Sequence, residues 1–187
     1  TAALAGAFLI AGAWGRWRDL SAVGMGPLYL AGIGLRGHQS LTTTHPLGWL
    51  LVACGIVTVC SVLFALYRPV VTAVATTVAG TAALIVVAIG GWYRPWGVIG
   101  EISPQLGAEG DAVEGLFAEL SPGWGLILTT VGAVLAVVAG IAGLVALGGR
   151  HRPLLLIVPV ALGAMAGVLA LALGAWSPDD AELIDVV

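Results

Sequence analysis

The side chains with the greatest capacity for chemistry lie outside the apolar segments of the chain. His38 and His45 occupy one polar stretch, and Glu109, Asp111 and Glu114 occupy another. Histidines and carboxylates can ligate metals or transfer protons, so an enzyme acting at an outer surface is one hypothesis. The acidic spacing does not match a calcium-binding loop, and no pattern specifies a nucleophile. A solvated acidic face is the simpler interpretation, and we predict no catalytic residue, no metal site and no cofactor.

Other motifs with a defined chemistry are absent from the sequence. It has no glycine-rich phosphate loop, and its seven basic residues do not form the patch that nucleic-acid binding requires. Cys54 and Cys60 lie inside an apolar segment, at a spacing that fits neither a redox dithiol nor a zinc pair. These features argue against nucleotide and nucleic-acid binding.

The composition is that of an integral membrane protein. Hydrophobic residues make up 59% of the 187 residues and charged residues 9%, whereas soluble domains carry about 25% charged residues. A membrane-spanning helix needs about 20 apolar residues, and the first apolar segment is short, so we expect native residues before Thr1. The sequence predicts an all-α single bundle of five transmembrane helices, four plus an extra C-terminal one. The predicted spans are 1–14, 47–67, 69–92, 124–147 and 153–176.

The connections between the predicted spans indicate the orientation of the chain. One short connection carries Arg68, the other carries Arg150 and Arg152, and neither contains an acidic residue. Short arginine-rich loops stay in the cytoplasm. We therefore expect a multi-pass protein of the bacterial plasma membrane, with a cytoplasmic N-terminus and an extracytoplasmic C-terminus. Four arginines are predicted to contact lipid head groups: Arg68, Arg94, Arg150 and Arg152.

Two long outer loops and an acidic tail complete the predicted organisation. Loop 15–46 contains the apolar stretches "LSAV" and "LYLAGIGL", separated by "GMGP". Glycine and proline between such stretches favour a small extracytoplasmic β-hairpin, with an irregular loop as the alternative. Loop 93–123 has apolar residues at helical spacing, which favours a short surface helix. Residues 177–187 form the acidic tail.

Small residues recur along single faces of the predicted helices. In lipid, close helix contact depends on small side chains more than on hydrophobic contrast. A composition rich in glycine and alanine is the alternative explanation for the pattern. We predict helix–helix contacts at Gly132, Ala136, Gly140, Gly163 and Gly167.

The centres of the predicted spans contain no ionisable side chain. Because such groups mark ion and proton pathways, their absence argues against a proton-coupled pump. We expect a non-catalytic accessory or structural subunit, whose partners are membrane lipids and other membrane protein subunits. The alternative is a component of a lipid or small-molecule transporter or channel. Its cavity would be lined by threonines of the third span: Thr72, Thr76, Thr77 and Thr81.

All seven tryptophans fall at the predicted outer ends of the spans. Tryptophan is enriched at membrane interfaces and also at protein-binding hot spots. An interfacial belt facing lipid and a docking surface for a neighbouring subunit are both open interpretations. The residues are Trp14, Trp17, Trp49, Trp92, Trp96, Trp124 and Trp176.

Several strings of the sequence carry a resemblance to known membrane proteins. They are "LIAGAWGRW", "HPLGWLL", "LYRPV", "GGWY" and "SPGWGLILTTVGAVLAVVAG", within about residues 1–148. The chain resembles small actinobacterial four-span membrane proteins, among them the tryptophan-operon-associated family, and more distantly the claudin-like four-helix layout. The fifth span departs from that pattern, and the claudin-like loop cysteines are absent. The resemblance implies a membrane bundle and assigns no activity or functional residue.

Overall fold

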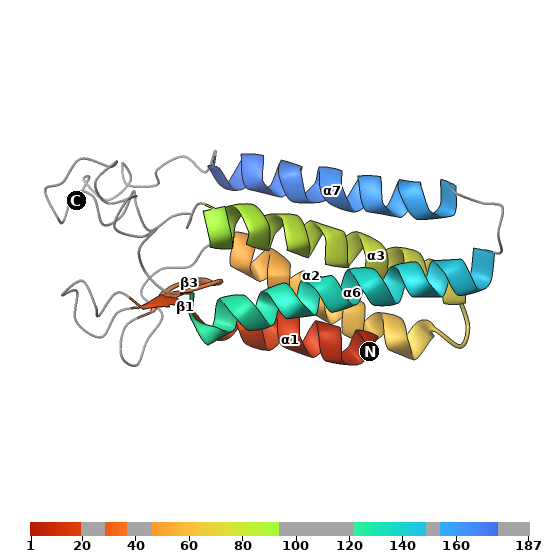
Figure 1. The fold of residues 1–187 in the computed structure, drawn as a ribbon, viewed down its shortest axis with the longest axis horizontal. Coiled ribbons are helices and arrows are strands. Elements are labelled where there is room, and N and C mark those ends of the chain that lie inside the picture. Colours follow the sequence, from red (N-terminus) through yellow and green to blue (C-terminus); the bar gives the residue numbers. More distant parts are fainter. Residues whose placement is uncertain (20–28, 37–45, 94–121, 149–153, 176–187) are drawn as a thin grey trace, which may run out of the picture.

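The chain folds as a helix bundle that carries a small sheet at one end (Figure 1). The structure is a computed structural model that describes residues 1–19, 29–36, 46–93, 122–148 and 154–175. Its helices are α1 (Ala2–Trp14), α2 (Pro46–Phe64), α3 (Pro69–Val86) with the π-helix η2 (Val87–Tyr93), α6 (Trp124–Gly148) and α7 (Leu154–Ala175).

Three of these helices are long and apolar enough to cross a membrane. They cover Leu47–Phe64, Pro69–Tyr93 and Trp124–Leu147, and they match the second, third and fourth predicted spans to within a few residues. The stretches Ala2–Trp14 and Ile157–Ala170 are apolar but shorter. The described residues therefore show a mostly helical protein with three candidate membrane spans.

Successive helices alternate in direction, and α3 lies at the centre of the bundle (Figure 1). α3 packs against α2, α6 and α7, while α1 packs between α2 and α6. A tight turn joins α2 to α3, in which the amide of Arg68 donates to the carbonyl of Phe64 at 2.9 Å. Pro69 follows as the first residue of α3, where its missing N–H would have had no helical partner.

The small residues predicted for packing lie where helices meet. A Cβ added to Gly132 would be 2.9 Å from the carbonyl of Ala5 in α1. Ala136 is fully buried and lies against Gly80 of α3. A Cβ on Gly140 would meet Thr77 of α3. On α7, a Cβ on Gly163 would be 2.7 Å from the Val78 carbonyl of α3. One on Gly167 would be 3.0 Å from the Ala82 carbonyl of the same helix. Thus α6 approaches both α1 and α3 closely, and α7 approaches α3.

Most of the described buried threonines satisfy their hydroxyl groups within their own helices. In each case the hydroxyl donates to a carbonyl one turn earlier, a pattern that keeps a polar side chain compatible with an apolar interior. The pairs are Thr58 with Cys54, Thr77 with Ala73 and Thr81 with Thr77, each at 2.8 Å, and Thr129 with Gly125 at 2.7 Å.

A three-stranded antiparallel sheet follows α1. Its strands are β1 (Arg16–Asp19), β2 (Tyr29–Ala31) and β3 (Gly34–Arg36), in the order β1-β2-β3. β2 and β3 form a tight hairpin, in which Gly34 has a φ of 139° that favours glycine. The predicted β structure in loop 15–46 is therefore confirmed, but its strands differ from those expected. "LYLAGIGL" contains β2 and the first two residues of β3, and β1 begins two residues after α1 ends.

Candidate functional site at the sheet-capped end

The sheet closes the carboxyl end of α1. The last carbonyl groups of a helix have no partner within the helix. Here the amide of Ile33, in the β2–β3 turn, donates to the carbonyl of Ala13 at 3.1 Å. The carbonyl of Gly12 accepts from the amide of Gly15 at 3.1 Å and from the indole Nε1–H of Trp17 at 2.9 Å. The hairpin and the indole therefore complete the hydrogen bonding of the helix end.

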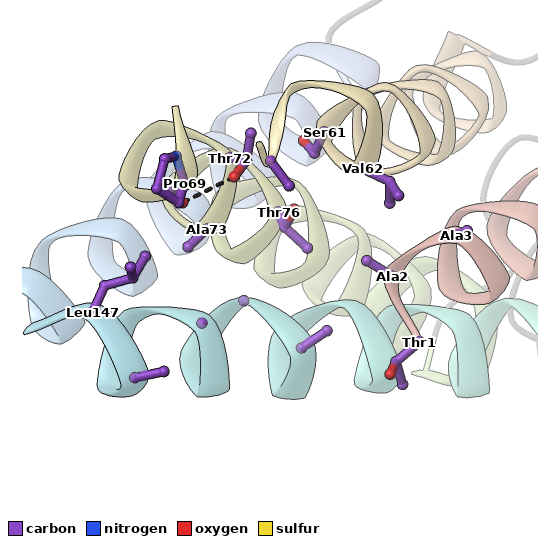
Figure 2. A pocket seen from close by; sticks show the side chains of 15 residues that line it. Thr1, Ala2, Ala3, Ser61, Val62, Pro69, Thr72, Ala73, Thr76 and Leu147 are labelled. Carbon is purple, nitrogen blue, oxygen red and sulfur yellow. Dashed lines mark hydrogen bonds between the residues drawn. The ribbon is translucent and has the colours of Figure 1, made fainter. Parts of the chain in front are cut away.

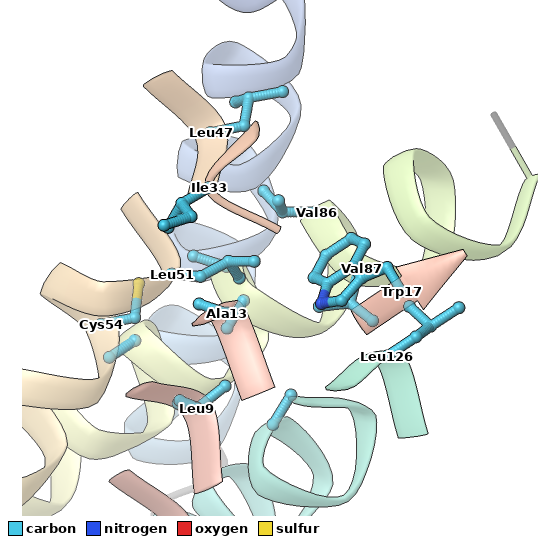
Figure 3. Close-up of a cluster of buried hydrophobic side chains, with 14 of the residues drawn as sticks. Leu9, Ala13, Trp17, Ile33, Leu47, Leu51, Cys54, Val86, Val87 and Leu126 are labelled. Carbon is cyan, nitrogen blue, oxygen red and sulfur yellow. The ribbon is translucent and has the colours of Figure 1, made fainter. Parts of the chain in front are cut away.

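Trp17 is the central side chain of this end and belongs to the hydrophobic core (Figure 3). It lies at an irregularity of β1, because Arg16 pairs with Ala31 and Arg18 with Leu30. Such a bulge redirects a side chain, and the ring of Trp17 is 1% exposed.

The glycines around Trp17 leave room for its ring. A Cβ on Gly32 would be 2.7 Å from Cζ2 of the indole, and one on Gly91 would be 2.9 Å from Cζ3. Trp17, which was predicted to join the interfacial belt or partner contact, is therefore buried instead, since the bulge turns its ring into the core.

Arg18 is a buried cation beside this core that sequence reasoning did not identify. The side chain is 6% exposed, and loss of hydration lowers the pKa of its guanidinium. Arginine nevertheless stays protonated in proteins, so Arg18 places a permanent positive charge within the sheet. The neighbouring ion pair of Arg16 with Asp19, at 3.5 Å, is exposed and contributes little to stability.

Among the described residues, four tryptophans are exposed around this end of the bundle. Trp14 and Trp49 stack edge to face, with ring centroids 5.9 Å apart and an interplanar angle of 87°. The indole N–H of Trp92, in η2, donates to the hydroxyl of Thr130 in α6 at 2.9 Å. The exposed fractions are 41% for Trp14, 46% for Trp49, 45% for Trp92 and 57% for Trp124.

The hydrogen bond between Trp92 and Thr130 can be tested by a double-mutant cycle. We expect Trp92→Phe and Thr130→Val to couple by about 0.5–1 kcal/mol in the free energy of unfolding, the usual strength of an interhelical hydrogen bond in lipid. Thr58→Val is the matched control, since the Thr58 hydroxyl bonds only its own helix. Coupling of Trp92→Phe with Thr58→Val as large as that with Thr130→Val would contradict a specific bond.

The other predicted residues do not join this site. Arg68 is exposed at the opposite end of the bundle, in the turn before α3. Within the described residues, no group of three or more His, Cys, Asp or Glu side chains is arranged to hold a metal. Cys54 is buried, Cys60 is exposed, and both are free. The remaining predicted residues lie outside the described ranges: Arg94, Arg150, Arg152, Trp96, Trp176, His38, His45, Glu109, Asp111 and Glu114. The surface helix predicted in loop 93–123 also falls outside them.

The described residues define a bundle of apolar helices, three of them long enough to cross a membrane, with a sheet-capped end bearing exposed indole rings. No protein-family model, no curated protein and no solved structure matches the chain. This end presents exposed aromatic faces, and the buried Arg18 lies in the sheet.

Proposed function

We propose that the protein is a non-catalytic accessory or structural subunit of a larger membrane protein complex. In this proposal all five helices cross a bacterial plasma membrane, with the N-terminus in the cytoplasm and the C-terminus outside it. Its partners are membrane lipids and other membrane protein subunits, with no role in nucleic-acid binding. Kinship with the small actinobacterial four-span proteins is part of the same proposal.

The observation that supports this function is the set of exposed tryptophans around the sheet-capped end. Tryptophan is strongly enriched among residues that dominate binding energy, and a rigid ring loses little conformational entropy when it is covered. The pairing of Trp14 with Trp49 and the bond from Trp92 to Thr130 hold three of these rings in place before any partner arrives. The sheet beside them adds an extramembrane surface of fixed shape.

Site-specific photo-crosslinking in native membranes tests the proposal. A photoreactive amino acid replaces Trp49 in one variant and Leu66 in the other. Leu66 is the matched control, because it is 91% exposed at the opposite end of the bundle. We expect position 49 to yield an adduct with one protein of defined mass, and position 66 to yield none. Lipid adducts alone at position 49 would contradict an accessory subunit that docks through this end.

A transporter or channel component is the second candidate, with a path expected along four threonines of α3. Thr72 and Thr76 line a cavity of about 400 Å³ at the end opposite the sheet (Figure 2). Thr77 and Thr81 do not line it: their hydroxyls bond their own helix, and the residues lie against Gly140 and Gly163. These two threonines therefore lie in contacts of α3 with α6 and α7.

A further inference from the structure

The end of the third helix has an unusual geometry. α3 continues as the π-helix η2 from Val87 to Tyr93. A π turn closes with hydrogen bonds between residues i and i+5, so it holds one residue more than an α turn. Such turns are rare, occur mostly as short bulges within α-helices and are frequent at functional sites. The contacts of η2 with the rest of the bundle show what holds this segment in the π geometry.

Two successive residues of η2 make these contacts. Gly91 is buried, and an added Cβ at this position would meet Cδ1 of Leu126 and lie 2.9 Å from Cζ3 of Trp17. Trp92, the next residue, donates from its indole N–H to the hydroxyl of Thr130 in α6 at 2.9 Å. Position 91 therefore accepts only a residue without a side chain, and position 92 directs its ring toward α6.

An α-helical form of the same residues would present a different residue to each contact. With one residue fewer per turn, the residues near the end of η2 would rotate by about 100°, the angle between successive residues of an α-helix. Gly90 would then take the direction that Gly91 has now, and the ring of Trp92 would turn away from Thr130. Residue 90 is also a glycine, and it is also buried. Both registers therefore place a residue without a side chain against Trp17.

The pair of glycines suits an exchange between the two registers, since glycine adapts its backbone to either geometry. The α register restores ordinary helical hydrogen bonds, whereas the π register makes the bond from Trp92 to Thr130. We propose that η2 exchanges between this π register and an α register, and that the exchange moves the Trp92 ring onto and off α6. Because Trp92 is 45% exposed at the sheet-capped end, the exchange changes the surface that this end presents. It is a property of the chain itself and does not depend on the accessory function.

Fluorine NMR tests the proposal on the full chain. The protein is labelled with fluorotryptophan and studied in mild detergent, and Trp92→Phe assigns the Trp92 signal by its loss. Trp124, at the start of the regular helix α6, is the internal control. We expect a major Trp92 signal from the π register, a minor Trp92 signal from the α register, and one signal from Trp124.

Two adjacent substitutions of the same kind should shift the Trp92 signals in opposite directions. Gly91→Ala places a methyl group against Trp17 in the π register, so the ratio of the minor signal to the major signal should rise by about tenfold. Gly90→Ala places the methyl group there in the α register, so the same ratio should fall. Identical Trp92 spectra for the two variants would overturn the proposal, as would an equal response of the Trp124 signal.

A milder pair of variants keeps the test decisive if a glycine variant fails to fold. Thr130→Val removes the acceptor of the Trp92 N–H with little change of shape. Loss of this interhelical bond should raise the ratio of the minor signal to the major signal by about threefold. Thr58→Val removes a hydroxyl that bonds its own helix and should leave the ratio unchanged. A single Trp92 signal in Thr130→Val, or a ratio equal to that of Thr58→Val, would contradict the exchange.

Discussion

Replacing Trp17 with alanine is expected to destabilise the bundle by about 3–5 kcal/mol, the usual cost of truncating a buried aromatic side chain. The ring is 1% exposed and packs against Gly32 of the hairpin and Gly91 of η2. Its N–H also satisfies the carbonyl of Gly12 at the end of α1. The substitution removes a contact between α1, the sheet and η2, so the free energy of unfolding in detergent should fall sharply.

Two further variants separate the contributions of the Trp17 ring and its hydrogen bond. Trp17→Phe keeps most of the apolar contact and loses the bond to Gly12, so we expect a loss of about 1 kcal/mol from the hydrogen bond plus a smaller loss of packing. Trp124→Ala is the matched control at the same end of the bundle, because that ring is 57% exposed. Its effect should be less than half that of Trp17→Ala. Equal losses for Trp17→Ala and Trp124→Ala would show that Trp17 is not the core residue that holds this end.

The helices were predictable because their signal is long and repeated. Each candidate span is an apolar run of about the required length, bounded by tryptophan, proline or arginine. Composition and length are sufficient to recognise such a run as a span. The tight turn before Pro69 was predicted as well, whereas α2 ends at Phe64, before the predicted end of the span at residue 67. The π-helical turns at Val87–Tyr93 were not predicted, since no local signal distinguishes them from a continued α-helix.

The sheet-capped end was only partly predictable. Glycine and proline in loop 15–46 indicated β structure, but the capping of α1 depends on Ile33 reaching Ala13 across the fold. The bulge that buries Trp17 is likewise a property of strand pairing, which the sequence does not reveal. Position near a helix end was the available signal, and it assigned all seven tryptophans to the same predicted belt. Burial of Arg18 has the same origin, because alternation along an isolated strand cannot show which residues a bulge turns inward.

The glycine pattern indicated which faces pack, whereas the partner of each face required the structure. The residues Gly132, Ala136 and Gly140 lie on one helix but contact two others, α1 and α3. Spacing along α6 does not distinguish those partners, since small residues permit close approach to any helix. The contact of Thr77 in α3 with Gly140 in α6 could therefore be identified only from the structure.

Gly140→Ala and Gly143→Ala are expected to differ in stability although the residues are one turn apart on α6. A Cβ at position 140 would meet the hydroxyl of Thr77 and lie 2.7 Å from its backbone nitrogen. Thr77 cannot turn away freely, because its hydroxyl bonds the Ala73 carbonyl at 2.8 Å. The seam between α3 and α6 must therefore open, and overpacking of this kind costs about 1–3 kcal/mol.

At position 143 the nearest atom to an added Cβ is the methyl group of Ala73, at 3.1 Å, and the cavity lies alongside. A small shift relieves that contact, and alanine gains about 1 kcal/mol of helix propensity over glycine. Gly143→Ala should thus be neutral or mildly stabilising, while Gly140→Ala lowers the melting temperature measured by circular dichroism in the same detergent. Because both variants make the same chemical change, a difference in stability isolates the α3–α6 contact. Equal melting temperatures would mean that α6 does not meet Thr77 as closely as described.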